Sequence, residues 1–348
     1  MQNHDIRLSH DLTALRFVHF FGWLRIVELA KLMKPHTSSS LEAGSRIARS
    51  LINRKLVLAR RLPEGSGQAL VLSTAGVRLL AEYGINATPG KNIGSAVGKY
   101  WIPSATWKHD LISHGLLCEL FKQGYEVLPE TEIRRRAGVV AKLPDGLVRT
   151  PSKEWLWLEV EHARKSGTHM HRLTSAIIAV SSRQIEICGV RPTRCLIAYI
   201  SESFDERGYR LNHRDRITRA IAATTHSDIP IIFAECKRKG SAGISSLALT
   251  ETTIEANRIS AILKQLNRSG WYSDEISGVW QAHHGKFTAY VWQDSNAPGT
   301  WSYDADGNEW SGPGGYVGNI SEAKRCAAAL IATHQANPFF TTRQILQE

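Results

Sequence analysis

The segment that most constrains the fold is residues 155–161, WLWLEVE, in which tryptophan or glutamate alternates strictly with leucine or valine. This alternation is typical of a β-strand, whose successive side chains point to opposite faces of a sheet. Glu159 and Glu161 therefore share one face, while Leu158 and Val160 share the other. Neighbouring carboxylates repel each other. Unless a cation lies between them or solvent surrounds them, one is driven toward its protonated form.

The chain around this strand alternates between helical and strand-like patterns from residue 108 onward. This order predicts a mixed α/β domain with a small central sheet. The expected segments are a helix at 108–123, a strand at 125–134, extended runs within 139–148 that turn through Pro144-Asp145-Gly146, the strand at 155–161, a helix at 169–183, a strand at 194–200, a helix at 214–224 and a strand at 229–234.

The first eighty residues follow another order. Apolar residues at helical spacing predict helices at 10–23, 25–33 and 41–56. Ser39 and Glu42 have the spacing of a capping box that starts the third helix. Two β-type runs flank a turn at 63–67, and another helix follows at 74–83. Three helices, a hairpin and a helix in this order predict an N-terminal winged helix-turn-helix.

The third helix of a winged helix enters the major groove, where arginine and asparagine side chains reach base edges or phosphates. Of the formal net charge of +11, most lies in residues 1–110, with 15 Lys and Arg against 7 Asp and Glu. The alternative is a solvated basic face in a winged helix that contacts proteins. The candidate DNA-binding residues are Arg46, Arg49, Asn53, Arg54 and Lys55 on this helix and Arg60 and Arg61 on the wing.

Changes of composition suggest further boundaries along the chain. Short aromatic strands and a terminal helix at 321–333 predict a small antiparallel β plus helix module. Its tryptophans either pack the sheet against the helix or, where they are exposed, provide surfaces on which bases can stack. The expected organisation is a winged helix at 8–85, a linker at 86–107, the α/β domain at 108–237, a helical connector at 238–278 and the aromatic module at 279–348.

Three carboxylates are candidates for a metal site. Asp145 lies between extended runs, where a hairpin places it beside Glu159 and Glu161. Oxygen ligands of this kind suit Mg²⁺ or Mn²⁺. Lys165, four residues after Glu161, is placed to orient an attacking water or to offset the charge of a phosphate.

This pattern resembles the PD-(D/E)xK nuclease superfamily. The resemblance implies a restriction-endonuclease-like domain in which Asp145, Glu159 and Glu161 bind a divalent metal and Lys165 assists cleavage of a phosphodiester. Glu119, on the preceding helix, matches the accessory acidic ligand of that superfamily. The sequence departs from the usual motif because Glu161 stands at the position of the lysine.

A narrower resemblance covers about residues 10–235. The winged helix, a helix opening near His109-Asp110, the PDG turn and the segment LEVEHARKSG together resemble the replication-relaxation family of plasmid and integrative elements. That family includes the MobC-type mobilisation relaxases. The resemblance implies a Mg²⁺- or Mn²⁺-dependent DNA-nicking protein, a relaxase or endonuclease. It would bind double-stranded DNA at a transfer or replication origin, together with other mobilisation proteins.

Two other interpretations stay open. One is a non-catalytic plasmid replication or transcription regulator, which the missing lysine of the E-x-K pattern favours. The other is a sheet edge whose Glu159 and Glu161 pair with the arginines at 134–136 and with Arg164. No apolar run is long enough to span a membrane, and the five scattered cysteines and the absence of a secretory signal predict a cytoplasmic protein.

Overall fold

The computed structural model describes residues 2–35, 40–90, 93–97, 100–138, 142–162, 167–201, 212–224, 227–238, 244–273, 277–295, 299–307, 310–311 and 314–336. It confirms the predicted mixed α/β class, with a six-stranded mixed sheet and a C-terminal antiparallel sheet. The chain forms two compact units. The first comprises Met1–Ala163, Ser182–Leu211 and Ile232–Thr250, and the second comprises Arg164–Ser181, Asn212–Ile231 and Glu251–Glu348.

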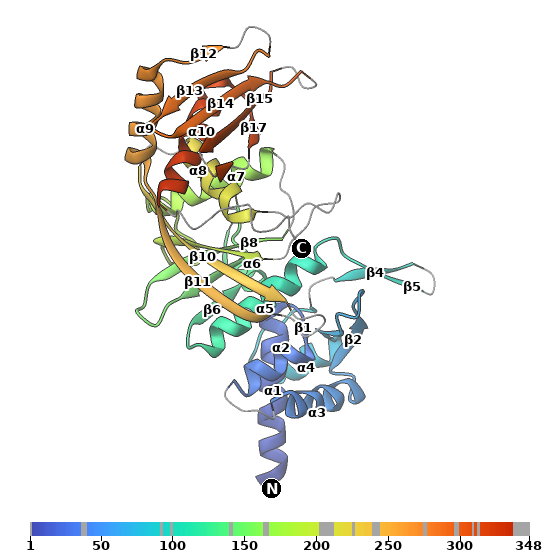
Figure 1. The fold of residues 1–348 in the computed structure, drawn as a ribbon. Coiled ribbons are helices and arrows are strands. Elements are labelled where there is room, and N and C mark those ends of the chain that lie inside the picture. Colours follow the sequence, from blue (N-terminus) through green and yellow to red (C-terminus); the bar gives the residue numbers. More distant parts are fainter. Residues whose placement is uncertain are drawn as a thin grey trace. The chain divides into compact units, whose positions relative to one another are not determined.

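The first unit opens with helices and a three-stranded antiparallel sheet of order β1-β3-β2 (Figure 1). The helices and hairpin predicted between residues 10 and 83 are confirmed, although the first helix begins earlier than expected and Ser39 lies outside the described residues. The elements are α1 (Gln2–Phe21), β1 (Leu24–Arg25), α2 (Ile26–Met33), α3 (Ser40–Asn53), β2 (Val57–Arg61), β3 (Gln68–Leu72) and α4 (Thr74–Glu82).

The turn between β2 and β3 contains two successive residues in the left-handed backbone region. Glu64 and Gly65 adopt positive φ angles of 54° and 66°. The backbone N–H of Leu62 donates to the carbonyl of Gly67 at 2.8 Å and closes the loop. Ser73 then caps α4, because its Oγ accepts the N–H of Gly76 at 3.1 Å.

Residues 86–107, expected to be an irregular linker, contain a two-stranded antiparallel hairpin instead. It is formed by β4 (Gly94–Val97) and β5 (Tyr100–Pro103). Gly94 is required at its position, since a Cβ there would lie 2.2 Å from the carbonyl oxygen of Ile102. The hairpin was not apparent because this glycine- and serine-rich segment has no alternating apolar pattern.

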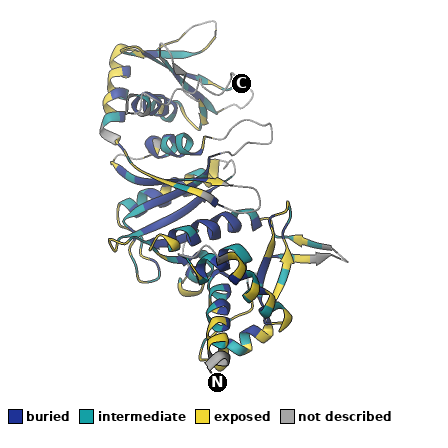
Figure 2. Cartoon of the chain, turned by 60° about the horizontal axis from the view of Figure 1, so that its bottom comes forward, coloured by how far each residue is buried: buried dark blue, intermediate teal, exposed yellow. Residues whose placement is uncertain are grey.

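A six-stranded sheet, formed mainly by the first unit, has the order β11-β10-β9-β8-β7-β6. Strand β7 pairs antiparallel with both β6 and β8, and β8 pairs parallel with β9. Helix α5, which packs on β6, β7 and β8, is buried along most of its length (Figure 2). The elements are α5 (Trp107–Lys122), β6 (Glu126–Pro129), α6 (Glu130–Arg136), β7 (Gly146–Arg149), β8 (Trp155–Glu161), β9 (Arg194–Ile200), β10 (Ile229–Arg238) and β11 (Ile244–Ile254).

The strand predicted at 125–134 is wrong in its second half, where the chain turns into α6 after Pro129. Acidic residues lie in the first turn of this helix and arginines in the last. Arg136 pairs with Glu132 at 2.7 Å across one helical turn, an arrangement that favours a helix over a strand. The extended run expected before Asp145 is also absent from residues 142–145, while 139–141 lie outside the described residues.

The second unit contains the C-terminal sheet, of order β12-β13-β14-β15-β16, with β17 also paired to β15. Helix α10 packs on β14 and β15 and also contacts α8 and α9. Lys324 of α10 lies over the rings of Trp271 and Trp280, at 4.7 and 5.6 Å, so these two tryptophans pack the module. The elements are α7 (Gly167–Ser181), α8 (His213–Thr224), α9 (Ala256–Ser269), β12 (Tyr272–Ser273), β13 (Trp280–His284), β14 (Phe287–Gln293), β15 (Trp301–Gly307), β16 (Trp310–Ser311), β17 (Gly315–Val317) and α10 (Ile320–Ala336).

Among the residues that the structure describes, none of the helices combines the length and apolarity needed to cross a bilayer.

Helices α2 and α3 approach each other closely at Gly44. A Cβ added there would lie 2.5 Å from the Cβ of Ala30. We expect Gly44→Ala to lower the free energy of unfolding by about 1–3 kcal/mol, because overpacking outweighs the helix propensity of alanine. Urea denaturation tests this, with Gly138→Ala as the control, since a Cβ at Gly138 would meet nothing within 4 Å. Equal effects of the two substitutions would contradict the close packing.

Candidate functional site

The first candidate site is the outer face of α3 together with the hairpin β2–β3, which lies against it (Figure 1). Every DNA-binding residue proposed from the sequence is exposed at this surface. On α3 and at its end these residues are Arg46, Arg49, Asn53, Arg54 and Lys55, and on β2 they are Arg60 and Arg61. We call these seven residues the basic surface.

The arginines of the basic surface differ in the contacts that their side chains make with the rest of the protein. Arg54 forms an ion pair of 2.6 Å with Asp11 of α1, so part of its charge is already balanced. The Nε of Arg49 donates to the carbonyl oxygen of Ser45 one turn earlier, at 3.4 Å. Arg46 and Arg49 lie one helical turn apart and face solvent together, as major-groove contacts require.

A buried ion pair supports the basic surface from inside. Arg25 and Glu28 are 3% and 2% exposed, and the Nε of Arg25 donates to Glu28 at 2.8 Å. Arg25 also donates to the carbonyl oxygen of Ser66, in the turn between β2 and β3, at 3.2 Å. This contact ties the hairpin to the start of α2.

The second candidate site is built where β7 begins beside the end of β8. Gly146 pairs with Leu158 across these strands, which places the preceding Asp145 against Glu159. The Oδ2 of Asp145 accepts the backbone N–H of Val160 at 2.7 Å. The structure therefore brings Asp145 and Glu159 together as expected, but it does so through the pairing of β7 with β8 and not through a turn between extended runs at residues 144–146. Glu159 and Glu161 are almost fully buried, at 1% and 2% exposure, so solvent does not separate their charges.

Cationic and N–H donor side chains complete this site. Lys142 Nζ donates to both carboxylate oxygens of Glu159, at 2.6 Å to Oε2, and Trp157 Nε1 donates to Oε1 at 2.6 Å. His109, in the first turn of α5, lies with its Nε2 3.1 Å from the Oδ2 of Asp145. We call Lys142, Asp145, Trp157, Glu159 and His109 the carboxylate cluster.

No role was expected from the sequence for Lys142, Trp157 or His109. Trp157 is the one with a usable signal, because on a strand it points to the same face as Glu159 two residues later. Lys142 and His109 reach the cluster from a loop and from a helix, so no local spacing marks them.

Burial and charge set the protonation of the cluster. Burial, reinforced by the charge of Asp145, raises the pKa of Glu159 to about 7, although Lys142 and Trp157 act in the opposite direction. Burial disfavours a charged His109, but hydrogen bonds and charges from Asp110 and Asp145 outweigh it and raise its pKa to about 10. Burial likewise opposes ionisation of Asp145, yet the His109 contact prevails and lowers the pKa of this carboxyl. At neutral pH, Asp145 and His109 therefore form an ion pair.

Glu119, proposed as an accessory metal ligand, lies elsewhere. It follows His109 by ten residues on α5, about 15 Å along the helix axis, and pairs with Lys31 of α2. Its expected role as a ligand beside Asp145 is therefore wrong. Lys165 lies outside the described residues, so its expected role stays a prediction.

The arginines that the alternative interpretation placed beside the acidic pair are engaged within their own helix. Arg134 pairs with Glu130, and Arg135 and Arg136 pair with Glu132. Arg164 lies outside the described residues. Glu159 is indeed part of an ion pair, as that interpretation proposed, but its cation is Lys142.

The carboxylate cluster does not fit a divalent metal in this arrangement. Within the described residues, no group of three or more His, Cys, Asp and Glu side chains is placed to hold a metal ion. Both oxygens of Glu159 and the Oδ2 of Asp145 already accept hydrogen bonds or lie against a cation. A metal bound to Glu159 would have to compete with Lys142 and Trp157 for its oxygen lone pairs.

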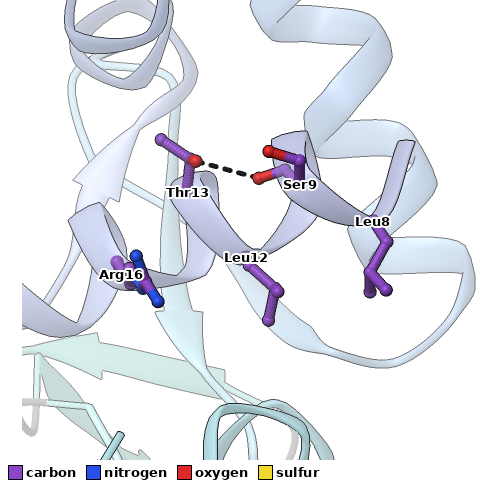
Figure 3. Close-up of a pocket in the computed structure, with 5 residues that line it drawn as sticks. All are labelled: Leu8, Ser9, Leu12, Thr13 and Arg16. Carbon is purple, nitrogen blue, oxygen red and sulfur yellow. Dashed lines mark hydrogen bonds between the residues drawn. The ribbon is translucent and has the colours of Figure 1, made fainter. Parts of the chain in front are cut away.

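Two pockets lie away from both sites. One, of about 270 Å³, follows a stripe of α1 lined by Leu8, Ser9, Leu12, Thr13 and Arg16 (Figure 3). The other, of about 340 Å³, is lined by residues 136–138 and 186–189. Neither lining includes a member of the carboxylate cluster or of the basic surface.

Comparison with known proteins gives no relative on which to base a function: no protein-family model, curated protein or solved structure matches the chain.

The ion pair of His109 predicts a pH dependence of stability. Because folding raises the pKa of His109 from about 6.5 to about 10, its contribution is complete below about pH 6.5 and is lost as the pH rises toward 10. We expect His109→Asn to lower the free energy of unfolding near pH 7 by about 1.5–3 kcal/mol and to have a smaller effect near pH 10. Urea denaturation at both pH values measures this.

The control for that experiment is His171→Asn, which replaces an exposed histidine of α7. It should change stability little at either pH. An effect of His109→Asn that stays constant with pH would contradict the ion pair.

Proposed function

We propose that this protein binds double-stranded DNA through its N-terminal region, which we interpret as a winged helix-turn-helix. The observation that carries the proposal is the basic surface, whose seven polar and charged residues are exposed together on α3 and β2. The order of α1, β1, α2, α3, β2 and β3, with β1 paired to β3, supports the winged-helix interpretation. In this proposal α3 enters the major groove and the wing contacts the flanking phosphates.

The charge distribution supports duplex DNA over a protein partner. Residues 1–110 hold 15 Lys and Arg against 7 Asp and Glu, whereas the rest of the chain holds 28 against 25. Such an excess attracts a polyanion and makes its binding sensitive to salt. Arg46, Arg49 and Asn53, at successive turns of one helix, are residue types that read guanine and adenine edges.

For the protein as a whole, we propose a regulator of replication, mobilisation or transcription on a plasmid or integrative element. The resemblance of residues 10–235 to the replication-relaxation family supports this biological context. The engaged carboxylates of the cluster support a non-catalytic role, because their lone pairs are occupied by N–H donors and a lysine.

The second candidate function is metal-dependent DNA nicking in a restriction-endonuclease-like domain. The observation that favours it is the meeting of Asp145 and Glu159 at neighbouring strands, with a lysine in contact with Glu159. The antiparallel strands β6, β7 and β8, followed by the parallel β9 and flanked by α5, support such a domain. Nicking would require Mg²⁺ or Mn²⁺ to reach carboxylates that Lys142 and His109 now neutralise.

The double substitution Arg46→Ala/Arg49→Ala tests DNA binding. We expect it to weaken duplex binding at least tenfold and to make log Kd less steep in log salt by about 1–2. Fluorescence anisotropy with duplex fragments of the host element, at several salt concentrations, measures both. Arg191→Ala, which removes an exposed arginine far along the chain, is the control and should bind like the wild type. Unchanged binding by the double variant would overturn the proposed surface.

A plasmid-relaxation assay separates the two candidate functions. Supercoiled DNA of the host element is incubated with the protein in Mg²⁺, in Mn²⁺ and in EDTA, beside Glu159→Ala. We expect no metal-dependent conversion to open circles, while duplex binding persists in EDTA. Conversion that needs metal and disappears in Glu159→Ala would establish nicking in place of the non-catalytic role.

A further inference from the structure

Buried carboxylates require a counter-charge, because an unpaired ion away from water is costly. Glu159 is 1% exposed, and Asp145 lies beside it, just before the neighbouring strand β7. Nuclease-like sites of this kind satisfy the requirement with a divalent cation. Among the residues that the structure describes, the cation that pairs with Glu159 is Lys142, whose side chain is 26% exposed and reaches inward from the surface.

The hydrogen bonds leave little for a metal to coordinate. Glu159 Oε1 accepts from both Trp157 and Lys142, and its Oε2 accepts from Lys142. Trp157 is 1% exposed, so its indole N–H cannot withdraw into solvent. The ammonium group is the donor that can leave, because its flexible stem already extends toward the surface.

Mg²⁺ and Mn²⁺ also bring geometric demands. These ions prefer oxygen ligands in octahedral geometry, and Mg²⁺ keeps several waters when it binds to protein carboxylates. A cation placed on Glu159 would therefore need space for its waters as well as the lone pairs that Lys142 uses. Lysine and metal compete for one position.

We propose that Lys142 is the resident cation of the carboxylate cluster and that its ammonium group keeps divalent metals out. Without the ammonium, the same carboxylates form a site for a hard divalent cation such as Mn²⁺. This inference concerns the cluster alone and does not depend on DNA binding.

The experiment titrates Mn²⁺ into the full-length wild type, Lys142→Met, Glu159→Gln and the double variant Lys142→Met/Glu159→Gln. The electron paramagnetic resonance signal of free Mn²⁺ reports how much is bound. Methionine keeps the length and the apolar stem of lysine and removes only its charge. We expect saturable binding of one Mn²⁺ per chain by Lys142→Met, lost in the double variant. The wild type and Glu159→Gln should show no such binding.

Two outcomes would overturn the proposal. In the first, the wild type binds Mn²⁺ saturably and Glu159→Gln abolishes this binding, so lysine and metal coexist. In the second, a folded Lys142→Met binds no Mn²⁺, so the ammonium is not what excludes it. If circular dichroism shows that Lys142→Met is unfolded, the comparison of wild type with Glu159→Gln decides. If the wild type and Glu159→Gln both bind Mn²⁺ equally weakly and without saturation, the proposal is supported. If the wild type binds more Mn²⁺ than Glu159→Gln, the proposal is overturned.

Duplex binding in EDTA, measured on the same samples, keeps the two proposals separate. We expect Lys142→Met to bind DNA as the wild type does, because its substitution lies outside the basic surface. If the wild type does not bind DNA, the proposed function is contradicted, while the assignment of Lys142 is unaffected.

Discussion

The first unit depends on one constraint: a charge taken out of water must meet an opposite charge inside the fold. Two of the ion pairs that satisfy it lie in different elements. Arg25 and Glu28 meet at the start of α2, while Lys142 meets Glu159 at the end of β8. Removal of either Arg25 or Glu28 would leave its partner buried and uncompensated, and removal of Lys142 would do the same to Glu159, which costs more than the intact pair contributes. The two pairs therefore specify where the surrounding backbone must lie.

Helix α5 connects these charged centres within the unit. Its first turn supplies His109 to Asp145, and Ser113 donates to the Asp145 carbonyl at 3.2 Å. Farther along, Gly115 faces Glu28, and Glu119 pairs with Lys31 of α2. One helix thus carries contacts to the central sheet and to the N-terminal helices. Its burial on nearly every side reflects this position between two layers.

Sequence patterns predicted the helices and strands whose local apolar pattern is enough to specify them. The strand at 194–200 is apolar almost throughout and matches at both ends, whereas α6 contains Ile133 as its buried residue and is stabilised by charged pairs that alternation does not reveal. The meeting of Asp145 with Glu159 was expected from a turn at residues 144–146, but the antiparallel register of β7 and β8 produces it. The contact with Lys142 was not expected, because a loop lysine finds its carboxylate only after the sheet has formed.

The hydrogen bond from Arg25 to Ser66 has a consequence for how DNA would be read. Since the tip of the hairpin is anchored to Arg25, the residue that precedes α2, and α2 packs on α3, the proposed recognition helix and the proposed phosphate-contacting hairpin would form one pre-organised unit. The distance between α3 and the β2–β3 hairpin would then be fixed. A duplex whose groove width does not match this distance would have to deform in order to bind. The protein would therefore discriminate by DNA shape at base pairs that no side chain touches.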